Sequence, residues 1–353
     1  MQLPASADFH VHLRDGAMME AVVPTIRQGG VDMVYVMPNL VPPVTTVGHA
    51  LDYQKRLQAL EPRVTFLMSL YLHPSITPET ILEAKRAGIR GVKSYPAGVT
   101  TNSSSGVVDY ASFFPVFAEM ERQDMILNLH GESPSGGNVT VLNAEETFLP
   151  TFLSLHRRFP KLGIVLEHCT TAAAIQAVLS CGPTVAATIT AHHLYLIVDD
   201  WAGDAFNYCK PVAKTPQDRE ALLKAAGSGS PKFFLGTDSA PHPAVAKRGG
   251  ADGKGKHAAG VFTQPYATQL VLEAFEEGVQ QGVLGPEVLT PKLLAGFLGE
   301  HGRAFYGEPN SREVITVEEE KTETIMDAFS GGKGEFEVVP FRRGRSTNTL
   351  RWN

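Results

Sequence analysis

The stretch Asp8-Phe9-His10-Val11-His12-Leu13-Arg14-Asp15 (residues 8–15) places two histidines at the end of the first apolar run of the chain. Side chains two positions apart on a β-strand point to the same side, so the rings of His10 and His12 would share one face. Four later apolar runs end in a similar way, with Lys93, His130, His168 and Asp238. In a parallel barrel these strand ends meet at one mouth, where active sites are built. The six residues therefore predict the ligand shell of a two-metal hydrolase.

Short β-rich runs alternate with longer helical patterns along the whole chain. We expect strands at residues 7–12, 31–37, 64–70, 91–95, 125–130, 163–168, 184–190 and 232–237. We expect helices at residues 51–60, 77–87, 110–123, 144–159, 172–179, 216–226, 266–279 and 291–298. Eight strands with intervening helices predict an α/β fold, a (β/α)8 TIM-type barrel. A doubly wound open sheet is the alternative, but it would require a Gly-rich phosphate turn after an early strand, which the sequence lacks.

The domain organisation follows from where this alternation stops. We predict a catalytic barrel over residues 1–310 and a C-terminal extension over residues 311–353 that packs on it. From Val314 onward, Val, Ile and Phe alternate with charged residues, and the segment contains Gly331-Gly332-Lys333-Gly334. This pattern favours a small β appendage or an ordered extension.

Composition excludes several classes of partner and compartment. The formal charge of −6 gives no basic footprint for nucleic acid, and we interpret the short run 342–345 as a solvated tail. No apolar stretch approaches the roughly 20 residues of a membrane span, and residues 1–6 lack the features of a secretory signal. Cys169, Cys181 and Cys209 are an odd number without paired spacing, so we expect free thiols in a cytoplasmic protein.

Lys93 is the unusual member of the predicted ligand set. An ammonium group beside two divalent cations would add repulsion that a low dielectric amplifies. Reaction of the amine with CO2 gives a carbamate, which turns a positive group into a negative bridging ligand. We therefore hypothesise that Lys93 is carboxylated. Nitrogen and oxygen ligands suit zinc, although the spacing leaves cobalt or manganese open.

These motifs resemble the amidohydrolase superfamily and, within it, the dihydroorotase family of the short, stand-alone type. The resemblance rests on residues 8–15, Met37-Pro38-Asn39, Lys93-Ser94-Tyr95-Pro96 with Thr100-Thr101-Asn102-Ser103, and Gly236-Thr237-Asp238-Ser239-Ala240-Pro241-His242. It covers roughly residues 5 to 310. It implies the reversible, zinc-dependent cyclisation of N-carbamoyl-L-aspartate to L-dihydroorotate in pyrimidine biosynthesis. It also implies a homodimer.

The resemblance assigns roles to individual residues. It implies that His10, His12 and Asp238 bind the more buried of two Zn2+ ions. His130 and His168 would bind the second, with N6-carboxylated Lys93 and a hydroxide bridging the pair. Asp238 would also be the catalytic acid and base. Substrate contacts are implied for Arg14, Asn39 and His242 at the α-carboxylate, for the Lys210 backbone and Ala259 at the ring, and for Thr100 and Thr101 in a mobile loop.

Two stretches depart from the family pattern. The segment between His242 and Gly260 is longer and richer in Gly and Lys than in compact bacterial members, and Ala259 is aligned mainly through Ala258-Ala259-Gly260. Lys210 stands where a small apolar residue is common, but the expected contact there is with the main chain.

Two alternative functions are compatible with parts of this pattern. A hydantoinase-like cyclic amide hydrolase would share the metal ligands, although Arg14, Asn39 and His242 favour an anionic substrate. A catalytically silent barrel would have lost ligands, and none is missing here. We interpret His192 and His193, which follow the seventh expected strand, as supporting residues because the ligand set is complete without them.

Overall fold

The fold is an eight-stranded parallel barrel, and the computed structural model describes residues 1–318 and 320–353. The strands follow one another in space in chain order from β2 to β9, with parallel pairing at each step. A bridge between Val11 and Ser239, together with the Asp238 N–H bond to the His10 carbonyl oxygen (2.8 Å), brings the two edges of the sheet together. The barrel strands are β2 (Ser6–Val11), β3 (Val31–Val36), β4 (Thr65–Tyr71), β5 (Gly91–Ser94), β6 (Ile126–His130), β7 (Gly163–Glu167), β8 (Val185–Ile189) and β9 (Phe233–Leu235). The predicted (β/α)8 barrel is therefore confirmed.

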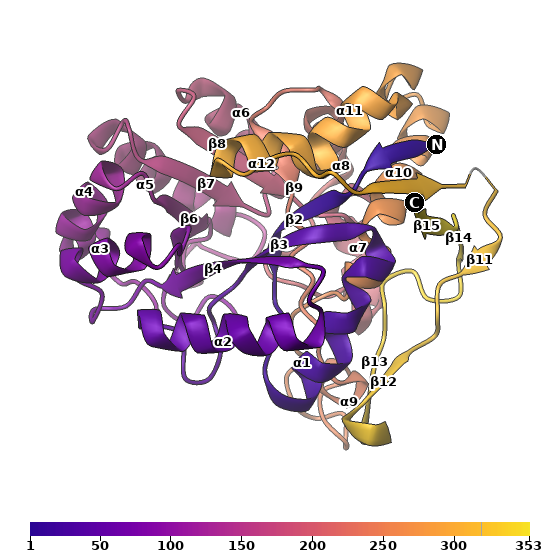
Figure 1. Cartoon of the computed structure of the whole chain (residues 1–353), viewed down its shortest axis with the longest axis horizontal. Helices are drawn as coiled ribbons and strands as arrows, with labels where there is room; N and C mark the ends of the chain where they lie inside the picture. The colour runs from indigo at the N-terminus through magenta and orange to yellow at the C-terminus, as the bar shows by residue number, and fades with distance from the viewer. Residues whose placement is uncertain (319) are drawn as a thin grey trace.

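Helices connect the strands and cover the outside of the barrel (Figure 1). They are α1 (Gly16–Val22), α2 (Val47–Leu60), α3 (Pro78–Arg86), α4 (Phe114–Arg122), α5 (Ala144–Arg158), α6 (Ala172–Ser180), α7 (Val198–Gly203), α8 (Pro216–Gly227), α9 (Ala244–Lys247), α10 (Ala267–Gln280), α11 (Pro291–Ala295) and α12 (His301–Tyr306). The helix expected over residues 110–123 begins as a 3-10 turn, η3 (Tyr110–Phe113), before α4. The sequence patterns did not predict the short helices α1, α7, α9 and α12, which have too few turns to show a helical period.

Helix-start residues fix where several of these helices begin. Thr77 caps α3 through the Thr80 N–H, and its neighbour Pro78 occupies the first turn. Thr215 caps α8 in a reciprocal pair with Asp218, which accepts from the Thr215 N–H. The α2 helix begins four residues earlier than expected because Thr46 accepts a hydrogen bond from the His49 N–H.

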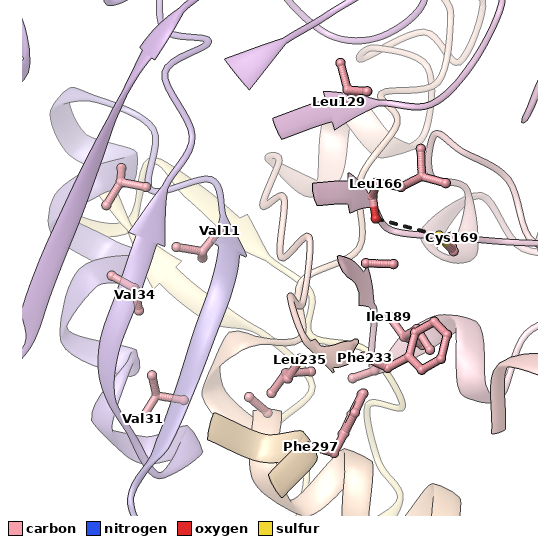
Figure 2. Close-up of a cluster of buried hydrophobic side chains, with 14 of the residues drawn as sticks. Val11, Val31, Val34, Leu129, Leu166, Cys169, Ile189, Phe233, Leu235 and Phe297 are labelled. Atoms are coloured by element: carbon pink, nitrogen blue, oxygen red, sulfur yellow. Dashed lines mark hydrogen bonds between the residues drawn. The ribbon is translucent and has the colours of Figure 1, made fainter. Parts of the chain in front are cut away.

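Alternating side chains divide the apolar residues of the barrel between two cores. On β3, Val34 and Val36 belong to the outer cluster between strands and helices, whereas Met33 and Tyr35 belong to the inner cluster. Figure 2 shows part of the outer cluster, with Val11, Val34, Leu129, Leu166, Ile189, Leu235, Phe233 and Phe297. Tyr306 of α12 joins the inner cluster by stacking on Phe9, with ring centroids 4.9 Å apart.

The two ends of the chain meet in a small sheet beside the barrel (Figure 1). Strand β10 (Val314–Val317) pairs antiparallel with both β1 (Gln2–Pro4) and β15 (Leu350–Trp352). The remaining short strands are β11 (Glu323–Thr324) with β14 (Ser346–Thr347), and β12 (Phe329–Gly331) with β13 (Phe336–Val338). Arg27 holds this sheet to the barrel, because its guanidinium lies 3.4 Å from the Trp352 ring centroid and bonds to Glu313.

None of the helices in residues 1–318 and 320–353 is both long enough and apolar enough to span a membrane.

Candidate metal centre and active site

Four buried histidines form a continuous row of rings at the carboxyl ends of β2, β6 and β7. Ring centroids are 5.4 Å apart for His12 and His10, 5.0 Å for His10 and His168, and 4.6 Å for His168 and His130. Burial lowers the pKa of His10, His12 and His168, so these imidazoles are neutral and can act as metal ligands. The structure thus brings together histidines that are up to 158 positions apart in the sequence.

Asp238, three residues after the end of β9, lies beside His10 and His12. Its Oδ1 lies 3.0 Å from His12 Nε2 and 3.4 Å from His10 Nε2. Burial acts to raise the pKa of Asp238, but the His12 hydrogen bond and electrostatic interactions with His10, His12 and Lys93 lower it to about 2. Asp238 is therefore a carboxylate at neutral pH, and its oxygen and the two histidine nitrogens lie within 4.8 Å of one another, as ligands of one cation would.

Lys93 lies on β5 with a fully buried side chain. Its Nζ has no hydrogen-bond partner within the described residues and is 5.1 Å from the Tyr95 ring centroid. Burial lowers the pKa of Lys93 to about 8, although Glu167 and Asp238 act to raise it. An orphaned buried amine requires an explanation. Carboxylation of Lys93 would turn the amine into a ligand that bridges two cations, and the residues around it fit such a pair. His168 Nδ1 is also buried without a hydrogen-bond partner among the described residues, as expected of a nitrogen that binds a cation.

The structure adds orienting groups that the sequence patterns did not predict. Glu167 Oε2 lies 2.7 Å from His10 Nδ1 and accepts a hydrogen bond from Thr188 Oγ1 at 2.6 Å. Glu167 Oε1 accepts from Asn128 Nδ2, also at 2.6 Å. A carboxylate on one ring nitrogen fixes the orientation of a metal-binding histidine through the other nitrogen. Asn128 could have been found from sequence, because it stands two residues before His130 and shares its inward face.

A second acidic side chain inside the barrel, Asp8, holds the end of β9 against β2, and burial raises its pKa to about 7. Asp8 accepts hydrogen bonds from the Thr237 N–H (2.8 Å) and Oγ1 (2.6 Å) and from the His10 N–H (3.1 Å). A Cβ on Gly236, just after β9, would lie 2.6 Å from Thr188 Cγ2 on β8 and 2.9 Å from His10 Cβ on β2. Glycine is required here because the strands approach too closely for a side chain.

Three residues at this end of the barrel have strained backbones. Arg14, His168 and Asp238 have φ values of 61°, 41° and 47°, in the left-handed region that non-glycine residues rarely adopt. Such conformations cost about 1–3 kcal/mol each and persist where the surrounding structure enforces them, often at functional sites.

A narrow cavity opens beside Asp238. Its lining includes most of the residues expected to contact substrate: Arg14, Asn39, Thr100, Thr101, Lys210 and Ala259, together with His12, Asp238, Ala240 and Gly260. His242 lies directly behind Arg14, with Nε2 3.1 Å from Arg14 Nη2 and 3.0 Å from the Ala259 carbonyl oxygen.

Arg14 is held toward the cavity rather than paired with its neighbour Asp15. Its Nε donates to the Pro241 carbonyl oxygen at 3.0 Å, while Asp15 pairs with Arg56. Burial lowers the pKa of Arg14 to about 10, so the guanidinium stays charged at neutral pH. It is therefore a cation that can bind an anionic group beside Asp238.

The loop of residues 100–106, which we call the lid loop, contributes Thr100 and Thr101 to the lining of the cavity. Asn39 Nδ2 donates to the Thr101 carbonyl oxygen at 3.1 Å, and Asn102 Nδ2 donates back to the Asn39 carbonyl oxygen at 2.9 Å. Lys210 Nζ donates to the Val99 carbonyl oxygen at 2.9 Å. The side chain of Lys210, expected to be incidental, therefore ties the opposite wall of the cavity to the base of the lid loop.

Lys247, another residue that the sequence patterns did not predict, organises the wall around Lys210 and Ala259. Its buried Nζ donates to the carbonyl oxygens of Tyr208 (2.7 Å), Ala258 (3.0 Å) and Gly260 (2.6 Å). A Cβ on Gly260, whose φ is 154°, would lie 2.2 Å from the Ala240 carbonyl oxygen. The long segment after His242 is thus anchored to the barrel at this wall.

No protein-family model matches the chain. Individual relatives, however, agree on one family. A probable dihydroorotase of Schizosaccharomyces pombe is 57% identical over 354 residues, covering 100% of this chain and 98% of that protein. The chain belongs to the dihydroorotase family. A dihydroorotase of Saccharomyces cerevisiae is 45% identical, again over 100% of this chain and 98% of that protein.

Solved structures support the same family and the barrel fold. The crystal structure of the Saccharomyces cerevisiae dihydroorotase in complex with 5-fluoroorotic acid matches with a TM-score of 0.90 and 44% identity, covering 100% of this chain and 98% of that chain. An L-hydantoinase of Arthrobacter aurescens matches with a TM-score of 0.78, but at 18% identity it shows only that the fold is shared. The family resemblance predicted from the motifs is confirmed.

Proposed function

We propose that this chain is a metal-dependent dihydroorotase that interconverts N-carbamoyl-L-aspartate and L-dihydroorotate. The observation that carries the proposal is the convergence of six sequence-distant side chains beside a cavity that presents Arg14. The relatives named dihydroorotase at 45–57% identity over the full chain support the same activity. Arg14, His242 and Asn39 favour an anionic substrate over the neutral ring of a hydantoin.

The ligand set fits two Zn2+ ions, which we propose as the native metals. His10, His12 and Asp238 would hold one ion, His130 and His168 the other, with carboxylated Lys93 between them. Bound there, the ions would supply a nucleophile from water near neutral pH and polarise the amide carbonyl. The neutral imidazoles and the orphaned Lys93 Nζ support this assignment.

The residues of the chain would position the substrate and move one proton. Arg14, Asn39 and His242 would bind the α-carboxylate, and the main chain at Lys210 and Ala259 would align the ring. As the ring closes, the Asp238 carboxylate would accept the proton from the carbamoyl nitrogen that attacks the side-chain carboxyl carbon. One oxygen of that carboxylate would leave as water, carrying this proton and one from solvent. In the opening direction the same group would return the proton to the departing nitrogen. Acid–base help of this kind contributes about 10²–10⁴-fold in rate.

The lid loop would complete the site by excluding water. Thr100 and Thr101 present small hydroxylic side chains to the cavity, and Asn39, Asn102 and Lys210 hold the loop closed through hydrogen bonds. A closing loop can make new contacts with substrate in the transition state.

The decisive experiment measures metal-dependent turnover by the purified chain. We expect turnover of L-dihydroorotate in both directions with added Zn2+, loss of activity after chelation, and no turnover of hydantoin. Arg14→Met should raise KM roughly 10- to 100-fold or more, because one hydrogen bond to a charged group contributes about 1.5–3 kcal/mol and about 1.4 kcal/mol corresponds to a factor of ten. Full activity without metal, or a preference for hydantoin, would contradict the proposal.

We also propose the domain bounds, the oligomeric state and the location of the protein. The barrel would cover residues 1–310 and the extension residues 311–353, because α12 ends at Tyr306 and β10 starts at Val314. We propose a homodimer on the basis of the family resemblance, to be tested by sedimentation. We propose a cytoplasmic location because all three cysteines are free, to be tested by cell fractionation.

A further inference from the structure

A second group of potential metal ligands lies outside the proposed two-metal centre. His192 and His193 are in η4 (His192–Leu194), just after β8, and Cys209 is in the segment that carries Lys210. All three side chains are buried, and one ligand atom from each lies within 4.8 Å of the other two. Their potential ligand atoms are two imidazole nitrogens and one sulfur, a donor set that zinc and similar divalent cations prefer.

His192 gives the strongest indication that something binds here. Its side chain is 0% exposed, and neither ring nitrogen has a hydrogen-bond partner within the described residues. Leaving a buried polar atom unpaired costs about 1–3 kcal/mol, so buried imidazoles are normally hydrogen-bonded. Burial lowers the pKa of His192 to about 3, which keeps the ring neutral and able to coordinate a cation.

The distance between the other two donors, Cys209 and His193, matches a tetrahedral cation. Zinc bonds of about 2.3 Å to sulfur and about 2.1 Å to nitrogen separate the two donors by about 3.6 Å at a tetrahedral angle. Cys209 Sγ and His193 Nε2 are 3.6 Å apart. The Pro211 carbonyl oxygen is 3.1 Å from His193 Nε2 and 3.2 Å from Cys209 Sγ, which makes it a candidate fourth ligand.

The hydrogen bonds of His193 allow its Nε2 to become a ligand. Nδ1 lies 2.9 Å from Thr190 Oγ1, and a hydroxyl can either donate to that nitrogen or accept from it. A switch of tautomer would place the proton on Nδ1 and leave the Nε2 lone pair free. The histidine would then be oriented by Thr190 through one nitrogen while the other binds the cation.

We propose that His192, His193 and Cys209 form a third cation site, selective for zinc-like divalent ions and separate from the proposed catalytic pair. Binding would form a cation–sulfur bond and release the Cys209 thiol proton to solvent, leaving a net charge of +1 on the cation and thiolate together. Burial raises the pKa of Cys209 to about 12, so without a cation the group is a thiol. The cation would fasten the segment of Cys209 and Lys210 to the end of β8.

Cobalt titration separates this site from the catalytic pair. The proposed catalytic ligands are nitrogen and oxygen only, so a thiolate-to-cobalt charge-transfer band in the near ultraviolet would arise from a cysteine. Protein stripped of metal by chelation should, on saturation with Co2+ alone, develop this band and bind one more ion per chain than Cys209→Ser. Cys209→Ser should lack the band, whereas Cys181→Ser, which alters a half-buried thiol elsewhere, should keep it.

His192→Leu is the second variant, because it leaves the thiol in place and removes an unpaired polar ring. We expect its affinity for the additional cobalt ion to fall about tenfold or more. Absence of the charge-transfer band at saturating cobalt, its persistence in Cys209→Ser, or wild-type cobalt affinity in His192→Leu would overturn the proposal. These readouts do not depend on catalysis, so failure of the dihydroorotase assay would leave the third site untouched, and the reverse also holds.

Discussion

Replacing Lys247 by Met should weaken substrate binding while leaving the metal ligands in place. The Lys247 ammonium is the common partner of three carbonyl oxygens on the cavity wall that includes Ala259. Methionine has a similar length and can fill the same apolar space, but it donates no hydrogen bond. The substitution therefore removes the anchor of this wall with little change in its packing.

The structure sets the size of the expected effect. The Tyr208 carbonyl oxygen keeps a second hydrogen bond, from the Gly260 N–H at 3.0 Å. The Ala258 and Gly260 carbonyl oxygens have no other hydrogen bond among the described residues. Two orphaned carbonyls cost about 1–3 kcal/mol each, and relief from burying a charge offsets part of this. The net cost is about 2–3 kcal/mol of free energy. We expect the wall to move so that these carbonyl groups reach water, and substrate binding must then restore the original position of the wall at that cost.

Steady-state kinetics with L-dihydroorotate measures this displacement. We expect KM to rise roughly 10- to 100-fold, since about 1.4 kcal/mol corresponds to a factor of ten, with a smaller change in kcat. Metal content should be unchanged. Lys254→Met is the matched control, because Lys254 lies in the same segment with an exposed side chain. Wild-type KM and melting temperature in Lys247→Met would refute the reasoning.

Three other variants test separate parts of the structure. Glu167→Gln removes the carboxylate that orients His10 and should lower metal affinity about 10- to 100-fold in a chelator competition, and unchanged affinity would exclude that role. Lys210→Met cuts the tie to the lid loop, so kcat should fall several-fold and lid-loop amide exchange should accelerate, whereas unaltered exchange would argue against the tie. Trp352→Ala removes the ring stacked on Arg27 and should lower the free energy of unfolding by about 2–4 kcal/mol in urea titrations, without altering kcat. An unchanged midpoint would show that the terminal sheet contributes little to stability.

The fold and the proposed metal ligands could be predicted from the sequence because a polar residue follows each of several short apolar runs. Each barrel strand is a short apolar run, and barrel geometry places all strand ends at one mouth whatever their separation in the chain. For that reason the six predicted ligands, His10, His12, Lys93, His130, His168 and Asp238, could be grouped before any distance was known. The helix starts at Thr77 and Thr215 were equally readable, because capping depends on residues three positions apart.

The orienting and anchoring groups could not be read in the same way. Glu167, Asp8 and Lys247 act on partners up to 229 positions away, through contacts that local periodicity does not encode. Nothing in the order of residues shows that Lys247 faces three carbonyl oxygens, or that the Lys210 side chain reaches the Val99 carbonyl oxygen.

The sequence by itself determined the strand order, the polar residue at each strand end and hence the proposed chemistry, because periodicity and barrel topology are local rules repeated along the chain. Only the tertiary structure decided which buried polar atoms are paired and which are left without a partner. That distinction depends on three-dimensional packing at the scale of a hydrogen bond, and it separates the satisfied Glu167 from the orphaned Lys93 and His192.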